Sequence, residues 1–367
     1  MRIVFISLIL LLLNLTTVTA QDPVFSLYFN NLVALNPALA GVNGTYNVSS
    51  QFRQQWAPIV NNNFSTATAN FDLSICSKNV DRYGLGVNLY SNKGGDGFLF
   101  NNFVGIDYSF MAINSCKKKK AHLLSFGLEG GWGITYIDWS KLVFSNQLDP
   151  RDGIITGSTN HFVSQNYGQR NYFDAAAGIF YRYKNENKFK NRFSGGNIGL
   201  SVHHLPRPNN GLAYNDNYQY PMKLTFHSGL EFPFYYRNRT KEMLRLQVRV
   251  RVISQFFKST NFTFVDIGNT FVFPENRFYS GFLLRFVPKS PALKNTYGTS
   301  FFIGYVLKEK NPQINIAYAF ENSIKGVSKD IVAGSTTSHE FSLNFIILNK
   351  KSCPSCGKKG QLDCFDF

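Results

Sequence analysis

From Thr45 onward, hydrophobic and polar residues alternate in short segments that are separated by turn-rich stretches. The segment from Leu244 to Val252 reads LRLQVRVRV, with Leu or Val at every even position and Arg or Gln at every odd position. Successive side chains of a β-strand point to opposite faces of its sheet. The pattern therefore predicts a strand with one apolar face and one cationic face.

About fourteen such segments follow one another along the chain, which predicts an all-β protein of antiparallel strands. They cover residues 45–56, 65–74, 83–90, 98–110, 122–138, 172–183, 197–205, 222–232, 244–254, 262–273, 278–286, 299–307, 313–320 and 338–348. Alternate connections are short and basic, such as KNENKFKNR and KEKNP, whereas the others tend to be longer and rich in Gly, Pro or Asn. This asymmetry is typical of outer-membrane barrels. An even number of strands places both termini on one side, which we expect to be the periplasm.

The first twenty residues show a signal-peptide pattern. One Arg, an apolar run from Ile3 to Leu13 and small residues up to Ala20 predict cleavage after Ala20. A transmembrane helix needs roughly 20 apolar residues, and no later stretch is long and apolar enough. A membrane-embedded mature protein must then be a closed β-barrel. We expect a transmembrane β-barrel over residues 45–348, preceded by a distinct segment at 21–44 and followed by a periplasmic tail at 349–367.

Composition favours a membrane barrel over a soluble protein. Charged residues make up 16% of the chain, against about 25% in soluble proteins, and aromatic residues make up 16%. The net charge of +16 does not indicate nucleic-acid binding, because the chain is predicted to be exported and has no nucleic-acid-binding motif. The alternative fold is a secreted soluble β-sandwich whose arginines face water, which accounts poorly for the aromatic excess and the turn asymmetry.

The cost of placing charge in lipid decides which way the predicted strands face. An arginine on the lipid face at mid-membrane costs about 2 to 4 kcal/mol. Turning Arg245, Arg249 and Arg251 outward would cost on the order of 6 to 12 kcal/mol, comparable to the stability of a whole domain. We therefore expect these arginines, and Lys223 on the preceding strand, to face the lumen. There they would pair with acidic lumen or plug groups such as Glu340 and Asp22, or meet passing anions.

The segment QDPVFSLYFNNLVALNPALAGVNG, residues 21–44, precedes the first predicted strand. Its aromatic side chains are candidate anchors, Asn36-Pro37 is a turn initiator, and Gly41 permits a sharp turn. Physical reasoning alone predicts an ordered plug or collar on the periplasmic side. Here the sequence resembles the PorP/SprF family of outer-membrane proteins of type IX secretion systems, whose members begin with this pattern and continue to an R-QW element. The resemblance is carried mainly by Gln21, Asp22, Pro23, Phe25, Tyr28, Asn36, Pro37 and Gly41, then Arg53 and Trp56.

The resemblance extends in order along the mature chain, for example through GNIGLSVHHLPRPN, although the usual Ser-Gly-Gly-Ser-His is altered before Ser338-His339. It implies a non-enzymatic outer-membrane component of the type IX secretion and gliding apparatus. The implied partners are periplasmic ring and motor proteins or associated lipoproteins, a large secreted surface adhesin, and outer-membrane lipid. The long outer loops and the tail favour the adhesin-specific role. The alternative function is a passive anion-selective channel, since an arginine-lined lumen would select anions.

Five cysteines form the remaining chemistry-bearing group. Cys76 and Cys116 fall in predicted periplasmic turns, and the tail carries Cys353, Cys356 and Cys364. Because all five share one predicted compartment in which disulfides form, we favour structural disulfides. Two alternatives remain for the CPSC segment. It could be half of a zinc knuckle, although the sequence has no second Cys-x-x-Cys, or a redox pair, although no thioredoxin-like unit surrounds it. We see no catalytic residues, no cofactor motif and no paired metal-ligand spacing.

Overall fold

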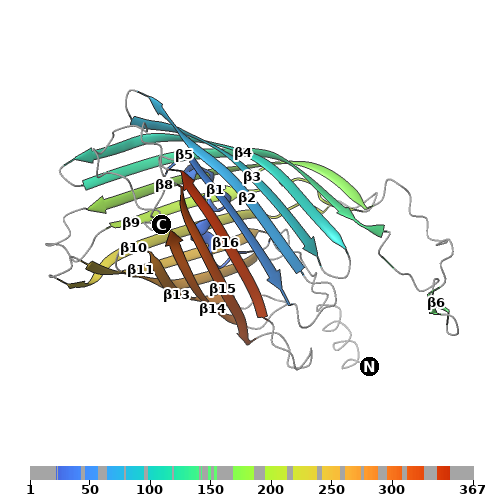
Figure 1. The fold of residues 1–367 in the computed structure, drawn as a ribbon. Coiled ribbons are helices and arrows are strands. Elements are labelled where there is room, and N and C mark those ends of the chain that lie inside the picture. Colours follow the sequence, from blue (N-terminus) through green and yellow to red (C-terminus); the bar gives the residue numbers. More distant parts are fainter. Residues whose placement is uncertain are drawn as a thin grey trace, which may run out of the picture.

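The structure is a computed structural model of the chain (Figure 1). It describes residues 22, 24–42, 46–56, 64–77, 80–94, 98–117, 120–139, 142, 148–149, 153–154, 168–185, 195–212, 218–237, 242–256, 261–273, 277–287, 296–307, 312–325 and 337–347. The predicted signal peptide, two residues of the N-terminal motif (Gln21 and Pro23) and the tail at 349–367 lie outside these residues.

Fourteen antiparallel strands form one closed barrel, which confirms the predicted fold class (Figure 1). The strands are β1 (Tyr46–Gln55), β2 (Phe64–Ser77), β3 (Val80–Gly94), β4 (Leu99–Lys117), β5 (Lys120–Ile137), β8 (Gln169–Asn185), β9 (Gly195–His203), β10 (Met222–Arg237), β11 (Glu242–Phe256), β12 (Asn261–Val272), β13 (Phe278–Val287), β14 (Thr296–Leu307), β15 (Gln313–Lys325) and β16 (Thr337–Ile347). Each strand pairs with its neighbour in sequence, and β1 pairs with β16 to close the ring, with Tyr46 opposite Ile347. The short β6 (Leu148–Asp149) and β7 (Gly153–Ile154), which the sequence pattern did not indicate, pair with each other between β5 and β8.

Several strands extend beyond their predicted ends. β4 continues to Lys117 and β10 to Arg237, through residues that read as turns in the sequence. As a result, Cys76 and Cys116 lie within β2 and β4, whereas the sequence pattern placed them in turns. Neighbouring strands satisfy each backbone N–H and C=O in a barrel, so polar residues at the rim do not end the ladder.

The exposure of side chains alternates along the strands, with apolar residues outward and polar residues inward, as a membrane barrel requires. Large apolar side chains point outward, and Ile106, Leu128 and Phe301 are each more than 60% exposed. Inward positions are polar and buried, as the sequence Asn47, Ser49, Gln51 and Arg53 of β1 shows. An apolar band outside and a polar interior are the arrangement of an outer-membrane barrel.

Residues 22 and 24–42, which we call the plug, lie inside the ring of strands (Figure 1, blue). The plug folds into three short helical turns, η1 (Tyr28–Asn30), α2 (Leu32–Leu35) and η2 (Pro37–Leu39). Asn31 and Asn36 precede α2 and η2, and their side chains accept hydrogen bonds from the N–H groups of Ala34 and Ala38. Such caps satisfy backbone groups that the short helices leave unpaired. In the described part of the chain no helix has both the length and the apolarity to cross a membrane.

Candidate functional site

The contact between plug and barrel wall begins at the seam between β1 and β16. Glu340 of β16 accepts the N–H groups of Ser26 at 2.7 Å and Leu27 at 2.8 Å. Arg53 of β1 lies 3.5 Å from Glu340 and 2.9 Å from Glu321 of β15, and all of these groups are largely buried. One ionic cluster therefore ties the plug to both strands that close the barrel.

From this cluster, alternating charges continue along the inner wall toward β11. Arg285 of β13 bridges Glu321 at 2.9 Å and Asp266 of β12 at 2.9 Å. Asp266 also pairs with Arg251, which donates to the plug carbonyl of Phe25 at 2.8 Å. Buried charges of this kind are stabilised only when they are paired and hydrogen-bonded. Arg53, Arg251 and Arg285 thus bind barrel carboxylates, and Arg251 also binds the plug backbone.

Aromatic residues of the plug cover two of the predicted lumen arginines. The guanidinium of Arg251 lies 3.9 Å from the ring centroid of Tyr28, and that of Arg249 lies 4.1 Å from the ring centroid of Phe29. Arg245, further along β11, pairs with Glu231 of β10 at 3.1 Å. Arg245, Arg249 and Arg251 are each 6% exposed or less, so all lie on the inner face.

The Asn-Pro-Ala turn of the plug packs directly on the backbone of β5 and β8. A Cβ atom added at Gly127 of β5 would lie 2.2 Å from the backbone nitrogen of Ala38, which no real contact allows. Ser125 donates to the carbonyl of Ala38 at 2.6 Å, and Ser109 of β4 donates to that of Ala40 at 2.6 Å. Small wall residues therefore form a cradle for this turn. Asn36 completes it by donating to backbone carbonyls of β8 and β9.

Gly41 ends the plug with a positive φ of +66°, a conformation that glycine adopts without strain. Its N–H donates to Asp72 of β2 at 3.0 Å, and Asn47 donates to the other carboxylate oxygen at 2.8 Å. The family-motif residues Asn36, Pro37 and Gly41 thus lie at the points where the plug touches the wall.

The opposite end of the plug is anchored near the long connections of the barrel. Asp22 lies 2.8 Å from Lys223 at the start of β10 and 2.9 Å from His204, which follows β9. The second ring nitrogen of His204 lies 2.5 Å from Asp174 of β8. Burial by itself opposes the charge on both groups, but Asp22 and Asp174 raise the pKa of His204 to about 9, and Lys223 with His204 holds the pKa of Asp22 well below its usual range. The Asp22 end is therefore held by a charged network.

A second wall of the lumen, formed by β2 to β8 on the part of the ring away from β11, is acidic. It carries Asp72 of β2, Asp107 of β4, Glu129 of β5 and Asp174 of β8, all less than 10% exposed. Sequence reasoning missed this wall, because each carboxylate stands alone in its strand, although each follows the inward alternation that identified the arginines. The lumen is therefore lined by both signs of charge.

The other predicted site residues are Trp56 and the five cysteines. Trp56 follows β1 on the outer surface, 39% exposed, and packs edge-on against Phe64. Cys76 and Cys116 belong to β2 and β4, which are separated by β3. The tail cysteines, Cys353, Cys356 and Cys364, lie outside the described residues, so their pairing stays a prediction.

Comparisons with known proteins identify the family. The family described as "Type IX secretion system membrane protein PorP/SprF" matches residues 17–345. No curated protein matches the sequence. Among solved structures, the chain is similar to the CymD monoaromatic hydrocarbon channel (10% identity, 90% of this chain and 95% of that chain, TM-score 0.45) and to a Pseudomonas aeruginosa FadL homologue (11%, 85% and 92%, 0.37). At these TM-scores the likenesses carry no argument about function. The family match spans the plug and nearly the whole barrel, and the chain therefore belongs to the PorP/SprF family of type IX secretion system membrane proteins.

Proposed function

We propose that this protein is a plugged, non-conducting and non-enzymatic outer-membrane component of the type IX secretion and gliding apparatus that acts by docking partner proteins. The observation that carries the proposal is the engagement of the lumen by the plug. Glu340 binds two plug N–H groups, Arg251 binds a plug carbonyl, and the turn at Ala38 touches the wall backbone. A segment held inside the lumen at so many points would obstruct a conducting pore.

The charge distribution argues against the alternative of a passive anion channel. An anion-selective lumen needs cationic side chains that are available to passing ions. Here Arg53, Arg251 and Arg285 are bonded to carboxylates, and a second wall carries Asp107 and Glu129. Both features oppose anion selectivity.

We further propose that the end bearing the short connections faces the periplasm and contacts ring or motor proteins or associated lipoproteins. β1 begins and β16 ends there, and the basic pair Lys117 and Lys120 flanks one of its turns. The opposite end carries the long connections, such as that between β5 and β8, and would receive a large secreted surface adhesin. This orientation follows the usual arrangement of outer-membrane barrels.

Planar bilayer recording tests the plugged state. The folded full-length protein, recognised by its heat-modifiable gel migration, should insert without giving a steady current. A large, stable anion current from the unmodified protein would support the channel and overturn the plugged barrel.

Deletion of the gene followed by a catalogue of surface proteins tests the role in secretion. Loss of one adhesin would indicate a dedicated partner, and loss of all exported cargo would indicate a core component. An unchanged surface catalogue and normal gliding would contradict the proposed function.

A further inference from the structure

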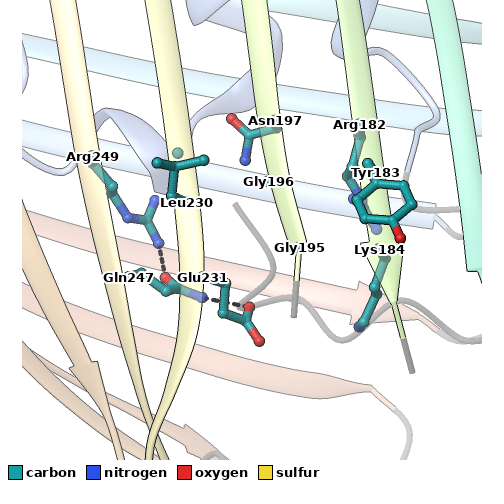
Figure 2. Close-up of a pocket in the computed structure, with 11 residues that line it drawn as sticks. Arg182, Tyr183, Lys184, Gly195, Gly196, Asn197, Leu230, Glu231, Gln247 and Arg249 are labelled. Carbon is teal, nitrogen blue, oxygen red and sulfur yellow. Dashed lines mark hydrogen bonds between the residues drawn. The ribbon is translucent and has the colours of Figure 1, made fainter. Parts of the chain in front are cut away.

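A small cavity lies on the inner wall near the short-connection end of the barrel, where β8 ends and β9 begins (Figure 2). Arg182 and Lys184 of β8 lie on one side of it, and Gln247 and Arg249 of β11 lie on the other. Glu231 of β10 lies between them. The small residues Gly195, Gly196 and Gly229 leave the space open.

Arg249 differs from the other arginines of the β11 to β1 wall. Arg53, Arg245, Arg251 and Arg285 each contact a carboxylate at hydrogen-bond or ion-pair distance. Arg249 donates to the neutral side-chain oxygen of Gln247 and stacks on Phe29 of the plug. Its Nε–H has no hydrogen-bond acceptor in the described part of the chain, although the side chain is only 6% exposed.

The nearest carboxylate in the cavity is already bound elsewhere. Gln247 accepts a hydrogen bond from Arg249 and donates one to Glu231, as the dashed lines in Figure 2 show. Glu231 also pairs with Arg245 at 3.1 Å. Glu231 therefore contacts Arg245 directly and is linked to Arg249 only through Gln247. A buried cation without a counter-charge costs several kcal/mol, so the cavity favours an anion beside Arg249.

We propose that this cavity binds a carboxylate of an acidic peptide segment that enters from the short-connection end. The unsatisfied edge of a guanidinium fits a carboxylate in a bidentate geometry. The enclosed part of the cavity has room for little more than a water molecule, so it fits the carboxylate group of a side chain rather than a whole residue. The inference rests on the proposed docking function, because a partner segment must supply the acid.

A peptide fits the position better than a lipid. The charged and amide side chains that line the cavity occupy inward positions and alternate with outward Tyr183 and Leu230. A lipid headgroup would reach Arg249 only by crossing the wall, whereas a peptide can enter the lumen from its end. Free phosphate is also an anion but is not part of a peptide chain. The experiment distinguishes free phosphate from an acidic peptide as the ligand.

The test measures binding of a short, fluorescently labelled glutamate peptide to the full-length protein in neutral detergent. A glutamine peptide of equal length and inorganic phosphate serve as comparison ligands. Arg249→Met removes the guanidinium, with its charge and its contact with Phe29, but keeps an unbranched side chain of similar length. Arg251→Met is the matched variant, since that arginine loses a guanidinium contact with Tyr28 but is already paired with Asp266. Thermal unfolding of each variant is recorded beside binding.

We expect Arg249→Met to weaken glutamate-peptide binding on the order of tenfold to a hundredfold, and to leave the unfolding temperature unchanged or higher. Arg251→Met should lower the unfolding temperature. The inference is overturned if the unmodified protein does not bind the glutamate peptide, if the glutamine peptide or phosphate binds equally well, or if Arg249→Met binds normally or unfolds as early as Arg251→Met. These outcomes leave the bilayer recording and the surface-protein catalogue untouched, so failure of this site and failure of the proposed function are distinguishable.

Discussion

Arg53 and Glu340 face each other across the seam that closes the barrel, as partners in the register between β1 and β16. Their side chains approach to 3.5 Å, and Glu340 also accepts two N–H groups from the plug. The same carboxylate therefore contributes to barrel closure and to plug attachment. The plug contacts both strands of the seam, since Gln51 of β1 also donates to the carbonyl of Leu27 at 2.8 Å.

Replacing Glu340 by Gln should destabilise the barrel by roughly 1.5 to 3 kcal/mol, the range for a hydrogen bond to a charged group. The loss is limited because Glu321 still pairs with Arg53. The temperature at which the heat-modifiable gel band shifts should fall accordingly. Phe341→Leu, on the adjacent outward position, is the control and should leave that temperature nearly unchanged. An equal shift in both variants would show that the cluster does not hold the seam.

Gly127→Ala should loosen the plug, because the added Cβ would lie 2.2 Å from the backbone nitrogen of Ala38. The turn must move off the wall, and the lumen should then conduct in planar bilayers. Gly130→Ala on the same strand is the matched control, since its Cβ would meet only Phe173 at 3.8 Å. The control should remain closed. A Gly127→Ala variant that folds normally but carries no current would mean that the turn does not seal the lumen.

The Asp22 network predicts a pH dependence of stability. Since the pKa of His204 is raised from 6.5 to about 9, its contribution is complete below about pH 6.5 and is lost as the pH rises through about 9. Since the pKa of Asp22 is lowered, its contribution is present above about pH 4 and is lost on further acidification.

Thermal unfolding from about pH 6 to about pH 10 checks the alkaline limb. The unmodified protein should lose stability toward pH 10, and His204→Gln should be less stable at neutral pH with a flatter profile. His122→Gln, which alters a histidine paired with Tyr181 away from the plug, should keep the original slope. Identical slopes in all three proteins would contradict a role for His204.

The strand order predicts that Cys76 and Cys116 do not form a disulfide with each other. Their strands are separated by β3, and two inter-strand spacings of about 4.8 Å exceed the Cα separation of about 7 Å that a disulfide tolerates. Peptide mapping without reduction should therefore find no link between these two residues. Detection of such a link in the folded protein would require a different arrangement of β2 to β4.

The sequence alone determined the barrel, its strand number and the facing of β11. Alternation with a period of two is a local property, and the cost of an arginine in lipid applies to each residue separately. Both can be evaluated without knowing which strands meet. The N-terminal motif likewise indicated the family before any contact was known.

Only the tertiary structure decided which charges meet. Arg53 pairs with Glu321, and Asp22 with His204 and Lys223, across separations in sequence that no local pattern encodes. The acidic wall was missed for a related reason, since each of its carboxylates stands alone in its strand and the four gather only when β2, β3, β4, β5 and β8 form one continuous wall. Barrel closure brings distant strands together in a buried, polar interior, and there the pairing of charge is set by position in space rather than by position in the chain.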